Sequence, residues 1–241
     1  MPKPSFPQLL SRTCLAAGAL FLLSLPPIAA VATTAPEGDQ PAIISGLGRV
    51  VDGDTLDVGG VRVRLEGIDA PETTQTCQTA NGGTWACGKA AAAMLRKLAE
   101  SQDVACDRTG TDRYRRTLAT CFVDGMNIEE AMVRAGLAWA FVKYSTSYVA
   151  VEAEARKQKI GVWQGPAQAP WEFRRNGWQV AEAVAPNGCA IKGNVSANGR
   201  IYHMPWDPWY EKVKMDERRG KRWFCSQDEA AAAGWRPAAS H

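Results

Sequence analysis

Residues 51–72 read VDGDTLDVGGVRVRLEGIDAPE, a stretch that combines strand patterns, turns and charged residues. Apolar and polar residues alternate in TLDV (55–58) and VRVRLEGI (61–68), while DGD and GG separate the runs. Alternation with a period of two predicts short strands, and the glycines predict tight turns between them. The stretch also places two arginines, Arg62 and Arg64, between acids. Folding does not require that arrangement, whereas a site that holds a cation and a phosphate together does.

The region that follows adds helices and further strands in a mixed order. An alanine-rich segment has helical spacing, and Asn127 and Gly136 frame a second helix as its cap and its stop. The further elements that we expect are helices at 85–101, 127–136 and 149–161 and strands at 48–51, 104–107, 117–125 and 137–142. Short strands with interposed helices favour a small mixed barrel over a parallel sheet.

The first 32 residues have the composition of a secretory signal peptide. Lys3 and Arg12 flank the start, an apolar run follows, and AVA (30–32) fits a small-residue cleavage site. The run is short and interrupted by two prolines, so we expect export to the periplasm or the medium without stable membrane insertion after cleavage. Cleavage would lower the formal net charge from +3 to +1, so bulk charge does not indicate a nucleic-acid partner.

Export changes the meaning of the cysteines. One of the seven, Cys14, falls in the predicted leader, and an even number remains. In an oxidising compartment such a set indicates disulfides. Proximity in the sequence favours the pairs Cys77–Cys87, Cys106–Cys121 and Cys189–Cys225, with other pairings open at this point. No CxxC motif occurs, which argues against a cysteine zinc site.

Composition divides the chain after residue 32 into four parts. We expect a flexible lead-in at 33–44, a main domain at 45–165, a linker at 166–185 and a small C-terminal unit at 186–241. The linker is predicted from the two prolines in QGPAQAPWEF. The tryptophans of the C-terminal unit favour a small aromatic core, although exposed tryptophans would instead stack on sugars or bases.

The carboxylates and arginines of the opening stretch fit a metal-assisted site. Asp54 follows a turn and Asp69 ends a strand, so both would ligate a hard cation such as calcium, together with a backbone carbonyl. Glu72 would then act on a water molecule. Arg64 would bind a phosphate, and a second arginine would come from DRYRR (112–116).

The order and spacing of these motifs resemble the staphylococcal thermonuclease family. DGDT, VRLEGIDAPE, CGKAA, DRYRR and MVRAGLAWA carry the resemblance, which covers roughly residues 45–165. It implies an α+β fold, namely a five-stranded OB-type barrel with three helices. It also implies an endonuclease, a hydrolase acting on ester bonds that cleaves DNA or RNA with one calcium ion (Ca2+).

The same resemblance assigns roles to individual residues of this chain. The calcium ligands would be Asp54, Asp69 and the backbone carbonyl of Ala70. The catalytic residues would be Arg64 and Arg116, which hold the phosphate, and Glu72, which acts as general base. The substrate-binding residues would be Arg113, Tyr114 and Tyr144. The chain departs from the family at Arg115, which stands where a glycine is usual, and in the insertion 77–87 beside the site.

Alternatives to a nuclease remain at this stage. A non-catalytic OB-type module of the cell envelope would bind nucleic acid or polysaccharide without turnover. Histidine-based nucleases are disfavoured because the only histidines, His203 and His241, lie outside the main domain. We expect a monomer whose partner is DNA or RNA, with a cell-envelope polysaccharide contact through residues 186–241 as the weaker expectation.

Overall fold

The computed structural model describes residues 42–238, except 113 and 115. The predicted signal peptide and most of the predicted lead-in lie outside the described residues, and so does Arg113, one of the predicted substrate-binding residues. Within the part of the chain that is described, no helix is both long and apolar enough to cross a bilayer.

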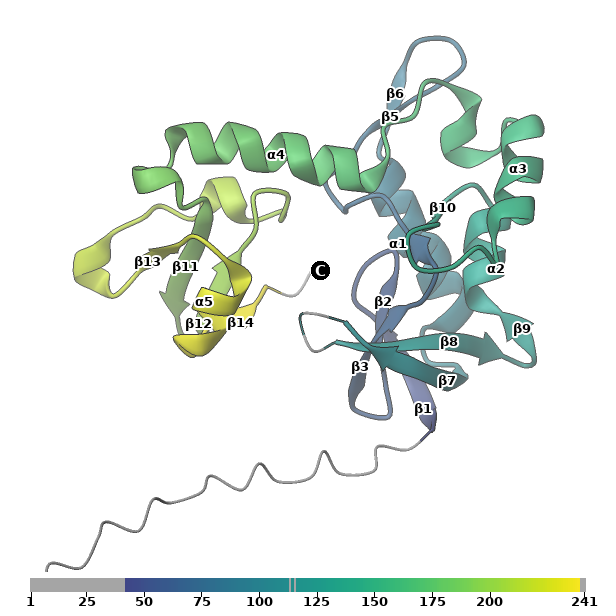
Figure 1. The fold of residues 1–241 in the computed structure, drawn as a ribbon, viewed down its shortest axis with the longest axis horizontal. Coiled ribbons are helices and arrows are strands. Elements are labelled where there is room, and N and C mark those ends of the chain that lie inside the picture. The colour runs from purple at the N-terminus through teal and green to yellow at the C-terminus, as the bar shows by residue number, and fades with distance from the viewer. Residues whose placement is uncertain (1–41, 113, 115, 239–241) are drawn as a thin grey trace, which may run out of the picture. The chain divides into compact units, whose positions relative to one another are not determined.

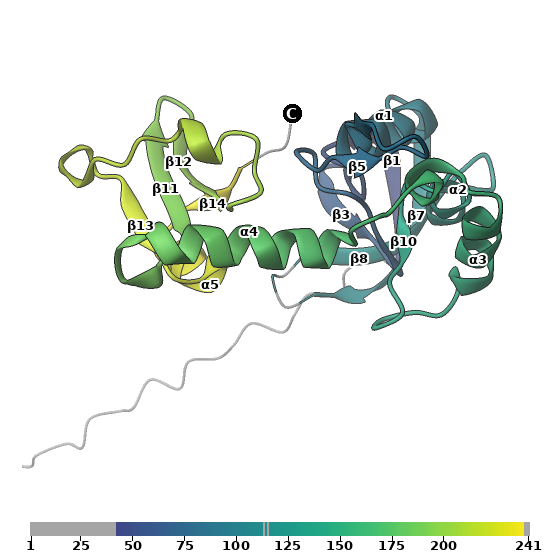
Figure 2. The same cartoon turned by 90° about the horizontal axis from the view of Figure 1, so that it is seen from above.

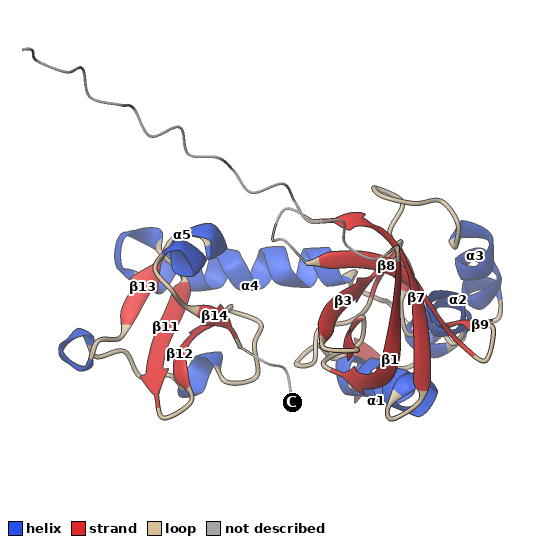
Figure 3. Cartoon of the chain, turned by 90° about the horizontal axis from the view of Figure 1, so that it is seen from below, coloured by secondary structure: helices blue, strands red, loops and turns tan. Residues whose placement is uncertain are grey.

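Five strands close into a barrel of mixed strand directions (Figure 3). The strands are β1 (Ile43–Val50), β2 (Thr55–Val58), β3 (Val61–Leu65), β7 (Asp103–Thr111) and β8 (Thr117–Val123). They follow the order β3-β2-β1-β7-β8, and β8 then pairs with β3 to close the ring. This closing pair is parallel, with Val63 opposite Thr117, whereas the other pairs of the ring are antiparallel. The predicted α+β barrel is confirmed.

Apolar side chains fill the barrel interior in the pattern that the alternation predicts. Along β8, buried and partly exposed residues alternate at every position. Leu56, Val63 and Leu65 from β2 and β3 are at most 1% exposed. Burying each side chain of this kind contributes about 1.5–3 kcal/mol, so this core is the main source of stability for the strands that carry the site.

Three helices accompany the barrel (Figure 1), as predicted: α1 (Cys87–Ala99), α2 (Ile128–Arg134) and α3 (Val149–Lys157). Helix α2 begins at the expected cap, where the side chain of Asn127 accepts the backbone N–H of Glu130 at 2.7 Å. Leu95 of α1 and Met132 of α2 are fully buried in the barrel core. The helices therefore share one core with the strands.

The segment 137–142 is less regular than predicted. Only Trp139–Ala140 forms a strand, β10, which pairs with β4 (Ile68–Asp69). The expected strand stops there because the chain turns, and the backbone N–H groups of Tyr144 and Ser145 both bond the carbonyl of Phe141. Three further short strands complete this half of the chain, namely β5 (Cys77–Gln78), β6 (Thr84–Trp85) and β9 (Met126–Asn127).

A fourth helix, α4 (Pro170–Val184), occupies most of the segment 166–185, for which we predicted a linker (Figure 2). Proline is well tolerated at the first position of a helix, where its missing N–H has no intrahelical partner. A four-stranded sheet and a short helix follow: β11 (Ile191–Ser196), β12 (Gly199–His203), β13 (Arg222–Phe224), α5 (Gln227–Ala232) and β14 (Arg236–Pro237). The rings of Phe224 and Trp235 lie 5.0 Å apart in the core of this unit, the role that the sequence favoured for its tryptophans.

The predicted disulfides are all present, as Cys77–Cys87, Cys106–Cys121 and Cys189–Cys225. Cys106 and Cys121 lie directly opposite each other on β7 and β8. The first bridge joins the two ends of the insertion 77–87, where β5 and β6 form a small hairpin. Each bridge therefore restrains a different part of the structure.

Candidate active site

Asp54 stands at the end of the turn between β1 and β2. The turn approaches its neighbours closely, because a side chain at Gly53 would come within 2.8 Å of the methyl group of Ala70. The buried carboxylate of Asp54 accepts the backbone N–H of Ala70 at 2.9 Å. A glycine in the turn thus brings Asp54 against the segment that carries the second acid.

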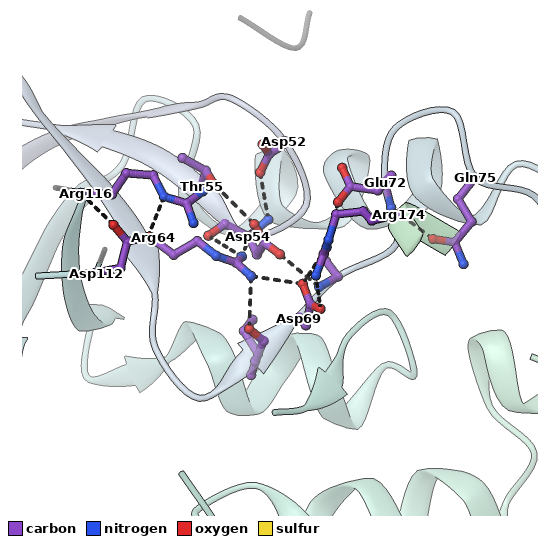
Figure 4. Close-up of polar contacts among 12 residues, drawn as sticks. Asp52, Asp54, Thr55, Arg64, Asp69, Glu72, Gln75, Asp112, Arg116 and Arg174 are labelled. Carbon is purple, nitrogen blue, oxygen red and sulfur yellow. Dashed lines mark hydrogen bonds and ion pairs between the residues drawn. The ribbon is translucent and has the colours of Figure 1, made fainter. Parts of the chain in front are cut away.

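Asp69 ends β4, and its side chain is fully buried. The guanidinium of Arg64 reaches it from β3, with 2.9 Å between Nη2 and Oδ1, and also pairs with the carboxylate of Asp54 (Figure 4). Burial lowers the pKa of Arg64, and the charge of Asp69 opposes that effect. One arginine therefore bridges two acids that the sequence placed in the same site.

Arg62 has a different partner from Arg64. It faces Asp57 across β2 and β3, and its Nε lies 2.8 Å from Oδ1 of that residue. Asp57 also pairs with Arg49. Of the two arginines in the opening stretch, Arg64 belongs to the acid cluster and Arg62 stabilises the neighbouring hairpin.

Glu72 follows Pro71 in the loop that leads to α1. Its carbonyl oxygen lies against the first turn of α1, where any side chain at Gly88 would overlap it. Its backbone N–H donates to the side-chain oxygen of Gln75 at 3.2 Å. Burial raises the pKa of Glu72 to about 7, while the charge and hydrogen bond of Arg174 pull it down.

The loop that contains Arg116 is organised by Asp112, an acid that the sequence reading left without a role. Asp112 accepts the backbone N–H groups of Tyr114 and Arg116 at 2.9 Å and the Nε of Arg116 at 2.8 Å. The charge of Arg116 contributes to the lowered pKa of Arg64. The guanidinium of Arg116 also lies 5.5 Å from the ring of Tyr114.

Tyr144 packs against an aromatic neighbour. Its side chain is 60% exposed, and its ring packs edge-on against Phe141 at 5.0 Å. Phe141 in turn stacks on Trp171 of α4 with 5.5 Å between the ring centres. The predicted role of Tyr144 in substrate binding stays a prediction.

Arg174, on α4, is the residue of this cluster that the sequence reading missed. Its Nη1 lies 2.7 Å from Oε1 of Glu72 and 3.1 Å from Oδ1 of Asp69, and its Nη2 lies 2.8 Å from Oδ2 of Asp69. Burial alone would lower its pKa, but the two carboxylates outweigh burial and raise it. The residue is about a hundred positions from its partners, and no motif in the sequence marks it.

The oxygen atoms of this cluster suit calcium. Asp54 and Asp69 offer carboxylates, and Ala70, which follows Asp69 and donates its backbone N–H to Asp54, offers a carbonyl from the same segment. Calcium prefers oxygen ligands of this kind and completes its shell with water. Within the described residues, no cluster of three or more histidine, cysteine, aspartate or glutamate side chains is arranged to hold a metal. A site here would therefore depend on the backbone carbonyl and on water.

Residues 62–165 match the family model of the staphylococcal nuclease homologues. A micrococcal nuclease from Shigella flexneri is 37% identical over an alignment of 145 residues, and the alignment covers 53% of this chain and 78% of that protein. An uncharacterized endonuclease from Escherichia coli O157:H7 is 37% identical over 137 residues, 53% of this chain and 83% of that protein. The chain belongs to the staphylococcal nuclease family.

Membership of this family confirms the resemblance found in the sequence and indicates a phosphodiesterase that acts on nucleic acid. A third relative, a succinoglycan biosynthesis protein of Rhizobium meliloti (strain 1021) called ExoI, is 34% identical over 143 residues, 57% of this chain and 73% of that protein. The family match contains Arg64, Asp69 and Glu72, whereas Asp54 precedes it and Arg174 follows it. The roles of the individual site residues stay predictions.

Proposed function

We propose that this protein is an exported, calcium-dependent nuclease that hydrolyses phosphodiester bonds of DNA or RNA. The observation that carries the proposal is the bridge that Arg64 makes between Asp54 and Asp69. The bridge places the two acids that would bind the metal next to the arginine that would bind the phosphate, and all three lie close to Glu72. Family membership with a micrococcal nuclease among the relatives supports the same reaction.

Each residue of the cluster has a defined task in the proposed reaction. Calcium, when bound at Asp54, Asp69 and the Ala70 carbonyl, would polarise the phosphoryl group. Arg64 and Arg116 hold the phosphate and offset the negative charge that develops on its oxygens.

Glu72 accepts the proton of the attacking water. The water oxygen forms a bond to phosphorus, and the ester oxygen leaves and takes a proton from solvent.

Export is supported by two independent features. The first 32 residues have the composition of a signal peptide. The chain also holds three disulfides, and such bonds persist in oxidising compartments outside the cytosol. Mass determination of the N-terminus of protein recovered from the periplasm or medium tests this part, and an intact residue 1 on cell-retained protein would contradict it.

The activity is tested by cleavage of single-stranded DNA and RNA by the oxidised protein, with calcium and with a chelator. We expect calcium-dependent cleavage that Glu72→Gln and Arg64→Ala abolish. Arg62→Ala is the matched control, because it removes an arginine two positions away whose partner is Asp57. This variant should retain activity. A folded wild-type protein that binds calcium and cleaves neither substrate would overturn the proposal.

The second candidate is a non-catalytic module that binds polysaccharide or nucleic acid in the cell envelope. One relative carries the name of a succinoglycan biosynthesis protein, which favours a link to polysaccharide. Trp209 in the C-terminal unit is 46% exposed with the Lys212 ammonium 4.1 Å from its ring, a pair suited to stacking on sugars or bases. Binding of a ligand without turnover, lost after Trp209→Ala, would favour this candidate.

A further inference from the structure

We propose that Arg174 is a third phosphate-binding arginine of the active site, supplied by α4 from outside the matched family segment, and that it shares Asp69 with the cation. This inference rests on the proposed function. In the ligand-free site Arg174 holds Asp69 and Glu72, and in the loaded site it releases Asp69 to the metal and binds the phosphodiester.

The position of Arg174 is built by contacts on both sides of it. Before α4, the side-chain amide of Gln75 donates to the carbonyl of Gln168 at 2.8 Å. Within α4, Trp171 stacks on Phe141 with 17° between the ring planes. Residues three apart on a helix share a face, so the stacked Trp171 directs Arg174 toward the same side. An ordinary surface arginine is not positioned by a hydrogen bond and an aromatic stack of this kind.

Arg174 uses the same oxygen atoms that a metal would need. Its two terminal nitrogens contact both oxygens of Asp69 at 2.8 and 3.1 Å, the two-pronged geometry in which arginine recognises carboxylates and phosphates. The Asp69 side chain is fully buried, so no alternative approach to these oxygens is open from solvent. Arg174 and a cation therefore compete for Asp69.

Charge balance gives the displaced guanidinium a new partner. The ligand-free cluster contains the acids Asp54, Asp69 and Glu72 against Arg64 and Arg174, so it favours one more cation. A divalent cation bound at Asp69 leaves the guanidinium of Arg174 without this carboxylate partner, and a phosphodiester offers oxygens that can replace it. The Arg174 side chain is 25% exposed, so its guanidinium can meet a phosphate that enters from solvent.

This arrangement predicts opposite effects of Arg174 on the two ligands. Once its guanidinium is removed, Arg64 is the one competitor among the described residues that calcium still meets at Asp69, so calcium should bind several-fold more tightly. The phosphate loses a charge-assisted hydrogen bond, so its affinity should fall about tenfold or more. A residue that only holds α4 in place would change both affinities in the same direction, because its loss would loosen the whole site.

The experiment uses the oxidised protein and the variants Arg174→Ala, Arg174→Lys and Arg175→Ala. Calorimetry measures the binding of calcium alone and then of thymidine 3′,5′-bisphosphate in the presence of calcium. Steady-state cleavage of single-stranded DNA gives kcat and KM. Arg175 is the matched control, since it is the next arginine on α4 and is exposed.

We expect Arg174→Ala to raise KM and the bisphosphate Kd while the calcium Kd falls. Arg174→Lys should recover part of the phosphate affinity because it keeps the charge without the two-pronged geometry. Arg175→Ala should match the wild type. An unchanged bisphosphate Kd in both Arg174 variants, or a parallel loss of both affinities, would overturn the inference.

The two proposals fail in different ways. Both titrations work without turnover, so a wild type that binds both ligands and cleaves nothing would refute the nuclease alone. The lysine variant also keeps the test decisive if Arg174→Ala does not fold.

Discussion

Replacing Glu129 by glutamine should make the protein more stable at alkaline pH. Glu129 lies on α2, is fully buried, and accepts the backbone N–H of Cys121 at 2.9 Å. Burial raises the pKa of Glu129 from 4.5 to about 8 against the opposing effect of the hydrogen bonds, and the charge of Glu66 adds to the increase. The folded protein therefore keeps a proton that the unfolded chain has released.

The sign and size of the effect follow from that difference in bound protons. Between pH 4.5 and about 8 the folded state holds up to one proton more than the unfolded state. The free energy of unfolding therefore falls as the pH rises through this window, by about 1.4 kcal/mol per pH unit and roughly 4–5 kcal/mol in all. Glutamine keeps an oxygen for the N–H of Cys121 and has no charge to bury. Glu129→Gln should thus match the wild type near the lower limit of the window and exceed it above the upper limit.

Urea denaturation of the oxidised, metal-free protein across this pH range measures the free energies of unfolding. Glu130→Gln is the matched control, because Glu130 is the adjacent residue on α2, is 44% exposed and pairs with Arg134. It should retain the wild-type pH dependence. Equal slopes for the wild type and Glu129→Gln would mean that Glu129 ionises in the folded protein, and the reasoning from burial would be refuted.

Two further predictions concern the Cys106–Cys121 disulfide and the packing of the loop that carries Glu72. Replacing Cys106 and Cys121 together by serine opens a loop of 15 residues and should lower the free energy of unfolding by about 3 kcal/mol in urea denaturation. An unchanged midpoint would contradict this. Gly88→Ala should reduce kcat on single-stranded DNA by about tenfold or more, because the added methyl group overlaps the Glu72 carbonyl and displaces that residue. Gly110→Ala, where an added methyl group meets nothing within 4 Å, should keep the wild-type kcat, and equal kcat values for the two variants would rule out the steric argument.

The sequence predicted the features that depend on neighbouring residues. Asp54 and Asp69 belong to short strand–turn motifs, and the alternation of β3 places Arg64 on one face of its strand. The cap and stop residues predicted the position of α2. Capping by Asn127 requires only the backbone N–H of Glu130, three residues further along the chain. Such interactions act within a few residues, so a linear pattern records them.

Features that depend on distant packing left no comparable pattern. Two prolines made the segment 166–185 resemble a linker, yet one of them opens α4 as its first residue. The stacking of Trp171 on Phe141 and the bonds from Arg174 to Asp69 join residues 30 and 105 positions apart. The predicted strand at 137–142 also stopped early because Phe141 accepts two turn hydrogen bonds. Tertiary contacts decide each of these cases, and composition does not encode them.

The parallel pair of β3 and β8 has a consequence for when the protein can act. Thr117, which opens β8, lies opposite Val63, and Arg64 lies opposite Leu118, so the closing seam of the barrel brings the strand that carries Arg64 beside the end of the loop that carries Arg116. A folding intermediate in which β3 and β8 are not yet paired would contain all the strand motifs. It would still lack the arrangement in which Arg64 and Arg116 together hold a phosphate. If the proposed activity and the proposed export are both correct, a chain held unfolded for export is harmless to the nucleic acid beside which it is synthesised. Closure of the seam would then be the folding step that completes the active site.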